Sequence, residues 1–157
     1  MAMTAPVEMD KKQKGTAMAM TAPVEMAKDG AGATKQMKFY LPAEYDDMSK
    51  IPKPTNPAVT IEEIPPAVGA VHRYSGAYKE SNNEAMALAL AAQLREDGVD
   101  RMTDEYVKEH YVFWGYNPPF CLPMFRRNEV WLELTEEEAM QLEGKFEPTV
   151  EEKNVHG

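Results

Sequence analysis

The chain has 157 residues, of which 43% are hydrophobic and 27% are charged, and its formal net charge is −9. This composition is ordinary for one globular domain with a core of its own. The acidic balance argues against a large nucleic-acid interface, which needs clustered Lys and Arg. The longest apolar run, around Met86 to Leu94, is far too short to span a bilayer. Cys121 is the single cysteine, which rules out an internal disulfide and is compatible with a reducing compartment.

The N-terminal region holds an exact duplication, because MAMTAPVEM occurs at 1–9 and again at 18–26. A polar stretch separates the copies and no third copy follows, whereas a solenoid needs several stacked units. We interpret the pair as a local duplication in which the second copy belongs to the fold. Residues 1–17 are then a duplicated motif and linker, either disordered or forming an added strand that pairs beside the second copy.

Three strands are predicted before the middle of the chain. Residues 37–41 (MKFYL) alternate between two faces, as a strand requires, and a proline-rich loop follows them. The second predicted strand is 58–64 (AVTIEEI), which Pro65 and Pro66 end. The third is 67–78 (AVGAVHRYSGAY).

A long helix is the clearest predicted element. Ser81 and Glu84 form a capping-box pattern ahead of EAMALALAAQLRE, in which apolar residues recur at helical spacing. Gly98 is well placed to stop the helix, since glycine accepts the left-handed backbone angles common just past a C-terminus.

The C-terminal part is predicted to hold two strands and one short helix. The strands are 111–116 (YVFWGY) and 129–134 (EVWLEL), joined through the turn at 117–119 (NPP). Thr135 and Glu138 form a second capping-box pattern, and Gly144 is expected to end that helix. The folded domain is therefore placed at 18–146, with an acidic tail at 147–157.

Common catalytic and metal-binding patterns are absent from the sequence. The three histidines have no short spacing to one another or to Cys121, so no zinc site is expected. There is no G-x-S-x-G elbow, no phosphate-cradling glycine loop and no dinucleotide fingerprint. We expect no catalytic residue, no resident metal and no enzymatic activity.

Several motifs occur in one order that resembles the SOUL/haem-binding protein family. They are MTAPV at 20–24, MKFYLP, IPKPTNPAVTIEEIP, YSGAY before the helix, GYNPP at 115–119 and RRNEVWL at 126–132. The resemblance covers about residues 18–134. It implies an α+β fold with a distorted antiparallel β-barrel or sheet flanked by one long and one short helix, and binding of haem or another tetrapyrrole without known redox catalysis.

The resemblance also implies that this fold is incomplete at its N-terminus. Family members normally carry a strand and a helix before the MTAPV-type segment, whereas this chain starts at that motif. An incomplete barrel exposes a sheet edge and an apolar face, which favour association. We therefore expect a homo-oligomer or a protein partner that completes the barrel, besides the tetrapyrrole ligand, and no nucleic acid or membrane span.

The family pattern suggests candidate binding residues on the helix and among the basic side chains. Apolar helix residues would hold the porphyrin and arginines would meet its propionates, because a guanidinium fork matches a carboxylate. The candidates from this pattern are Met86, Leu90 and Leu94 on the helix and Arg73, Arg126 and Arg127. An axial histidine is not a shared feature of the family, and His72 is a separate candidate for an axial ligand from its place in a predicted strand.

Each candidate also has a structural interpretation. The Met and Leu stripe can be core, Arg126 and Arg127 can brace the turn before the last strand, and His72 can be a satisfied or exposed histidine. Two functions stay open: a non-enzymatic carrier or buffer of haem or a related tetrapyrrole, and a structural or interaction module that docks in a larger assembly.

Overall fold

The computed structural model describes residue 18, residues 21–28 and residues 34–146. The chain divides into two compact units. Among the described residues, one unit comprises residue 18 and Thr21 together with Tyr40–Pro65, and the other comprises residues 22–28, 34–39 and 66–146. The predicted segments 1–17 and 147–157 lie outside the described residues, so the predicted domain limits stay a prediction.

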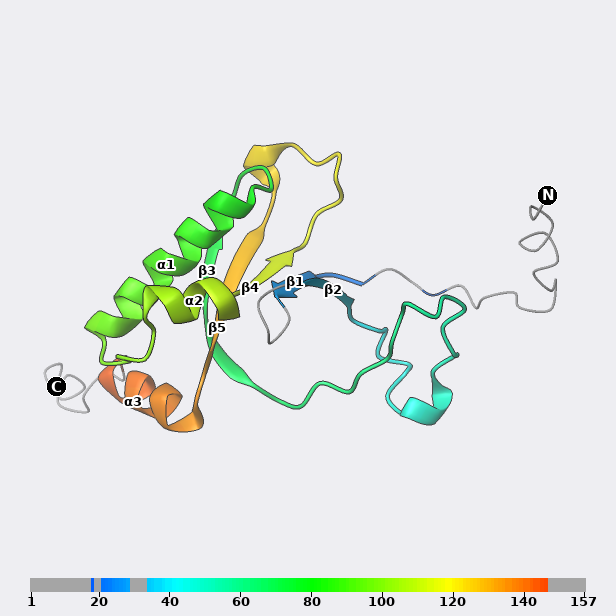
Figure 1. The fold of residues 1–157 in the computed structure, drawn as a ribbon, viewed down its shortest axis with the longest axis horizontal. Helices are drawn as coiled ribbons and strands as arrows, with labels where there is room; N and C mark the ends of the chain where they lie inside the picture. The colour runs from blue at the N-terminus through cyan, green and yellow to red at the C-terminus, as the bar shows by residue number, and fades with distance from the viewer. Residues whose placement is uncertain (1–17, 19–20, 29–33, 147–157) are drawn as a thin grey trace, which may run out of the picture. The chain divides into compact units, whose positions relative to one another are not determined.

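Five antiparallel strands form one sheet in the second unit (Figure 1). Their order across the sheet is β2-β1-β4-β5-β3, which leaves β2 and β3 at the two edges of the described sheet. The strands are β1 Val24–Lys28, β2 Lys35–Phe39, β3 Val68–Tyr74, β4 Val112–Gly115 and β5 Asn128–Leu134. The expected antiparallel α+β fold is confirmed, and over the described residues the sheet does not close into a barrel.

Alternation along β5 gives the sheet two chemically different faces. Val130, Leu132 and Leu134 are buried in the core on the face that the helices cover. Glu129 and Trp131 occupy the alternate positions and therefore lie on the opposite, helix-free face. The hydrophobic core thus sits between one face of the sheet and the helices.

The long helix α1 (Glu80–Glu96) lies across β3 and β5 (Figure 1). Ala87 and Ala91 are fully buried against the core, and their small side chains let the helix lie close to the sheet. Gly98 has φ +106°, so the predicted glycine stop is confirmed. The predicted capping box was wrong: α1 begins at Glu80, before Ser81, and its N-cap Lys79 makes no side-chain capping bond.

Two shorter helices complete the helical layer. The helix α2 (Asp104–His110) was not predicted, and it begins where the Thr103 side chain accepts a hydrogen bond from the backbone N–H of Tyr106. The helix α3 (Glu136–Phe146) begins with the predicted capping box, since Thr135 and Glu138 exchange hydrogen bonds of 2.9 and 3.2 Å. It continues through Gly144, so the predicted stop there was wrong.

The smaller unit has no strand among its described residues. It contains the 3-10 turn η1 (Met48–Lys50), which Asp47 caps by accepting a 2.7 Å hydrogen bond from the Ser49 N–H. The strand predicted at 58–64 was wrong, because that segment is irregular. Prolines flank it, and no described strand pairs with its backbone, so no ladder holds it extended. The remaining predicted strands correspond to β2, β3, β4 and β5.

Candidate functional site

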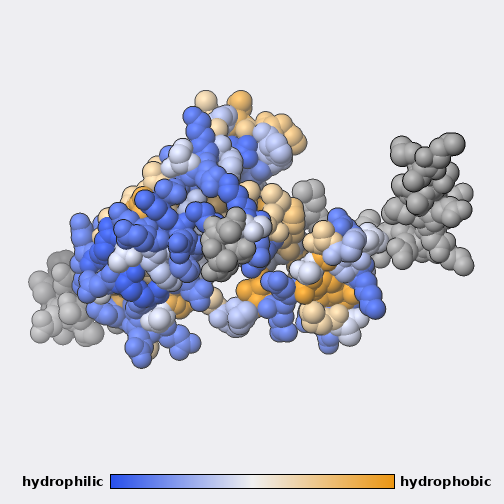
Figure 2. Space-filling view, viewed as in Figure 1, coloured by the Kyte–Doolittle hydropathy of each residue, from blue (hydrophilic) through white to orange (hydrophobic). Residues whose placement is uncertain are grey.

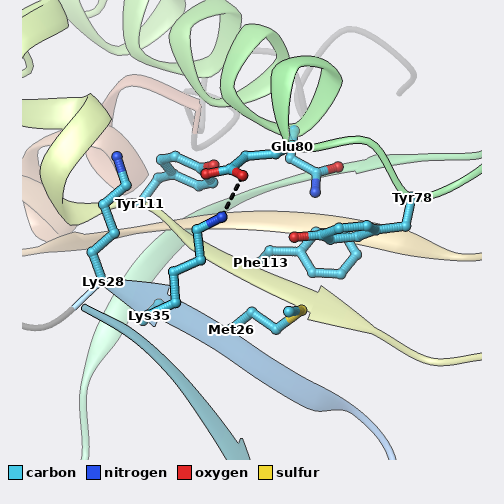
Figure 3. A pocket seen from close by; sticks show the side chains of 9 residues that line it. Met26, Lys28, Lys35, Tyr78, Glu80, Tyr111 and Phe113 are labelled. Atoms are coloured by element: carbon cyan, nitrogen blue, oxygen red, sulfur yellow. Dashed lines mark hydrogen bonds and ion pairs between the residues drawn. The ribbon is translucent and has the colours of Figure 1, made fainter. Parts of the chain in front are cut away.

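An aromatic hollow lies on the helix-covered side of the sheet, beside the N-terminal end of α1 (Figure 3). Its enclosed volume is only about 30 Å³, and the rest of the hollow is open to solvent. Its floor is apolar: Met26 and Phe113 face each other in the register of β1 and β4, and the Tyr78 ring meets Phe113 edge-on at 5.2 Å. The lining residues are Met26, Ala27, Lys28, Lys35, Tyr78, Glu80, Asn83, Tyr111 and Phe113.

Two lysines stand at the rim of this hollow. Lys28 on β1 is the register partner of Lys35 on β2, so two cations are placed opposite each other on one face of the hairpin. The Lys35 ammonium pairs with the Glu80 carboxylate of α1, as Figure 3 shows. Lys28 donates a 2.8 Å hydrogen bond to the carbonyl of Lys108. Among the described residues, the Glu80 carboxylate pairs with one of these two cations and the other donates to a backbone carbonyl.

The ion pair between Lys35 and Glu80 shifts both titrations. The hydrogen bond to Glu80 raises the pKa of Lys35, and the bond from Lys35 lowers the pKa of Glu80. Both groups therefore stay charged across the physiological range.

Tyr111 closes the inner end of the hollow, just after α2. Burial, together with the charges of Glu80 and Glu84, raises the pKa of Tyr111 to about 12. Its phenol is therefore protonated at neutral pH, which makes it an aromatic wall and a hydrogen-bond donor rather than an anion. Asn83 also reaches the hollow, and its side-chain oxygen accepts a 2.5 Å hydrogen bond from Tyr74.

The helix residues expected to hold a ligand differ in burial. Leu94 is 5% exposed and belongs to the core, whereas Met86 and Leu90 are partly buried and pack against the core from its margin. None of the three lines the hollow. The stripe at helical spacing therefore serves packing, with Ala87 and Ala91 as its central members.

His72 lies on the helix-covered face, where its register partner is the core residue Val130. Its ring stacks on Tyr74 with the ring centroids 6.1 Å apart. The side chain is half-buried and does not line the hollow.

The three candidate arginines lie toward the other side and one end of the sheet. Arg73 is exposed and is the register partner of Glu129, on the helix-free face. Arg127 pairs with Glu129 at 2.6 Å and stacks over the Tyr116 ring at 4.3 Å. Arg126 donates a 3.3 Å hydrogen bond to the Pro119 carbonyl. Two of the arginines are thus bound within the turn region before β5.

The sheet therefore divides the candidate residues between its faces. Successive residues of a strand point to opposite sides, so His72 and Arg73 project from opposite faces of the sheet. Met86, Leu90 and Leu94 share the face of His72, while Arg73 and Glu129, the ion-pair partner of Arg127, share the opposite face. The structure does not bring the seven residues together into one site.

Two other kinds of site are absent from the described part of the chain. Among residues 18, 21–28 and 34–146, no three His, Cys, Asp or Glu side chains are grouped closely enough to hold a metal ion. Within the same residues, no helix combines the length and apolar character needed to cross a membrane.

A family model described as SOUL heme-binding protein matches residues 1–133. The chain belongs to this family. The human protein named Heme-binding protein 2 is 35% identical over 100 residues, which cover 64% of this chain. The same match covers 45% of the human protein, so this SOUL chain corresponds to less than half of that relative.

The sequence could have indicated part of the hollow. Alternation in VEMAK places Met26 and Lys28 on one face of a strand, and KQMKF places Lys35 with Met37 in the same way. Nothing in the sequence gives the register that sets Lys28 against Lys35, or the approach of Tyr78 and Tyr111. Those residues come from four separate segments, which only the fold brings together.

Proposed function

We propose that this SOUL-family chain binds haem or a related tetrapyrrole without covalent attachment, as a carrier or buffer, with the ring lying against the open mouth of the aromatic hollow beside α1. Membership in a haem-binding family supports the ligand class. The paired lysines at the rim of the hollow are the observation that carries the choice of site.

The hollow matches the chemistry of a porphyrin in two respects. A flat apolar macrocycle gains from contact with the aromatic rings of Tyr78, Tyr111 and Phe113 and with the Met26 side chain. Its two propionates need cations, and Lys28 and Lys35 supply two on one rim. A bound haem would contribute the iron and the conjugated ring, while the protein residues supply burial and charge pairing.

Electrostatics favours an anionic group at this rim. Like charges placed directly opposite in a sheet are unfavourable, and Glu80 is the carboxylate that pairs with Lys35 in the structure. A propionate bound at Lys28 would reduce the repulsion between Lys28 and Lys35 that the single carboxylate of Glu80 does not fully offset. A second propionate would compete with Glu80 for Lys35.

Haemin titration tests the proposal. Wild-type protein should give a saturable spectral shift below the micromolar range, and Lys28→Gln/Lys35→Gln should weaken haemin binding by about tenfold or more. Lys50→Gln/Lys53→Gln, which removes two lysines of the smaller unit, is the matched control and should bind as the wild type does. A metal-free porphyrin separates burial of the ring from iron ligation.

The same titration can test the alternative binding site that the sequence predicted around the arginines. If Arg73→Ala/Arg126→Ala weakens haemin binding while the lysine pair can be removed without effect, the ligand sits at the turn before β5. Absence of any saturable shift with folded protein would reject tetrapyrrole binding altogether.

A second candidate is an interaction module that docks in a larger assembly. The edge strands of the described sheet support it, because β2 exposes Met37 and Phe39 and β3 exposes Val68 and Val71. Light scattering tests this function. A stable monomer at every concentration would argue against self-completion of the sheet.

A further inference from the structure

The turn between β4 and β5 exposes an unusual group of large apolar side chains. Phe120, Leu122, Met124 and Phe125 are 87%, 58%, 70% and 69% exposed. These four residues fall within six consecutive positions, 120–125, around the 3-10 turn η2 (Pro123–Phe125), and we call them the apolar tip. Figure 2 shows hydrophobic colour gathered at this end of the larger unit, beyond the N-terminal end of α1 in Figure 1.

Internal hydrogen bonds hold the backbone of this turn in place. Phe125 and Arg126 donate from their N–H groups to the carbonyls of Leu122 and Pro123 at 3.0 and 3.2 Å. Gly76 in the neighbouring loop donates to the Pro123 carbonyl at 2.9 Å. The apolar tip is therefore presented by a fixed turn, and it can enter an apolar phase with these backbone groups already paired.

The two loops at the apolar tip carry cations and no acid, although the chain as a whole is acidic. The chain carries a formal charge of −9, yet residues 110–128 contain no Asp or Glu and include Arg126 and Arg127. The neighbouring loop, 75–79, adds Lys79 and no acid. Arg127 is neutralised by Glu129, which leaves Arg126 and Lys79 as the cations of the two loops.

We propose that the apolar tip binds the surface of a bilayer that contains anionic phospholipids. The two Phe rings, Leu122 and Met124 enter the headgroup and acyl boundary, and Arg126 and Lys79 lie against lipid phosphates. Four side chains expose only a few hundred Å², less than the roughly 800 Å² per partner of a stable protein interface. A short protruding turn with a cationic margin therefore fits a lipid surface better than a protein partner.

This inference is independent of the tetrapyrrole proposal, since none of the apolar-tip residues lines the aromatic hollow. It also requires no membrane-spanning helix. Binding would be peripheral and reversible, because burial of a few side chains is far weaker than insertion of a helix.

Vesicle flotation of the full chain tests the proposal. Vesicles of phosphatidylcholine with about 30% phosphatidylserine should capture the wild type, and Phe120→Ser/Phe125→Ser should lower the partition coefficient by about tenfold or more. Met140→Ser is the matched control, because Met140 is exposed on α3, away from this turn, and its removal should change partitioning by less than about twofold. Raising the salt to about 0.5 M should weaken capture of the wild type.

A second readout places the apolar tip directly. Phe120→Trp keeps the apolar character, and its fluorescence should shift to the blue with anionic vesicles and be quenched by lipids brominated near the headgroup. No capture of the wild type, or equal capture of Phe120→Ser/Phe125→Ser, would overturn the proposal. The proposal would also fail if Phe120→Ser/Phe125→Ser abolished dimerisation or haemin binding while the wild type bound no vesicles. The apolar tip would then serve a second copy of the chain or the ligand.

Discussion

Arg101 and Glu138 form a two-point ion pair, in which Nε and Nη2 of Arg101 donate to the two carboxylate oxygens at 2.7 and 2.8 Å. Arg101 lies in the connection between α1 and α2, and Glu138 lies in the first turn of α3. Arg101 also donates to the Glu133 carbonyl at the end of β5. This pair therefore fixes α3 to the rest of the core.

The Arg101–Glu138 pair should make stability depend on pH in the acidic range. The bond from Arg101 lowers the pKa of Glu138 in the folded state. Its stabilisation is therefore complete above the unfolded pKa of about 4.3 and is lost as the pH falls through the folded pKa. Glu138→Gln keeps a capping-box side chain and removes the charge, so it should cost about 0.5–1 kcal/mol at pH 7.

Urea unfolding of both proteins at several pH values checks this expectation. The difference between wild type and Glu138→Gln should shrink as the medium becomes more acidic than about pH 4. A difference that stays constant with pH would mean that the ion pair contributes nothing to stability.

The duplicated motif offers an internal comparison between Met26 and Met9. Met26 packs against the core from β1 in the second copy, while Met9 has the same preceding sequence and lies outside the described residues. Met26→Asp should lower the free energy of unfolding by about 1–3 kcal/mol, because it places a carboxylate beside the core. Thermal unfolding of Met26→Asp and Met9→Asp measures both effects.

The outcome at Met9 bears on the predicted added strand. Both edges of β1 are paired along Val24–Met26, with β2 on one side and β4 on the other. We therefore expect Met9→Asp to change stability by less than about 0.5 kcal/mol. A loss as large as that of Met26→Asp would show that the first copy also packs in the fold.

Two glycines should respond in opposite directions to a single methyl group. A Cβ at Gly69 on β3 would collide with the Trp131 ring and lie 2.6 Å from the Leu132 carbonyl. Gly69→Ala should therefore cost about 1–3 kcal/mol. Gly144 lies inside α3 with nothing near its Cβ position, so Gly144→Ala should gain about 0.5–1 kcal/mol from helix propensity. Equal effects at the two positions would contradict the packing of Trp131 over β3.

Alanine substitutions at Leu94 and Met86 distinguish a role in core packing from a role in ligand contact. Leu94→Ala should cost about 2–5 kcal/mol, because it leaves a cavity under α1. Met86→Ala, at the margin of the core, should cost about 1 kcal/mol. Neither residue lines the hollow, so haemin affinity of the folded variants should stay within about twofold of the wild type, as titration would measure. A large affinity loss in Met86→Ala would place the ligand on the helix instead.

Local sequence signals determined much of this fold. Three predicted features depend only on residues close together in sequence. They are the capping box of Thr135 and Glu138, the helix stop at Gly98 and the alternation of buried and exposed residues along β5. Ordered motifs along the chain likewise indicated the SOUL family, which the family model confirms over residues 1–133.

Only the tertiary structure decided which side chains share a face. Residues 58–64 alternate as a strand would, yet they stay irregular because no described strand pairs with them. Lys28 and Lys35 meet because strand register, a non-local property, sets them opposite each other. His72 and Arg73 are neighbours in sequence and lie on opposite sides of the sheet, since the side-chain period of a strand is two. The sequence alone does not tell which candidate residues share a face of the sheet. Which face of a strand is buried depends on the elements that pack against it.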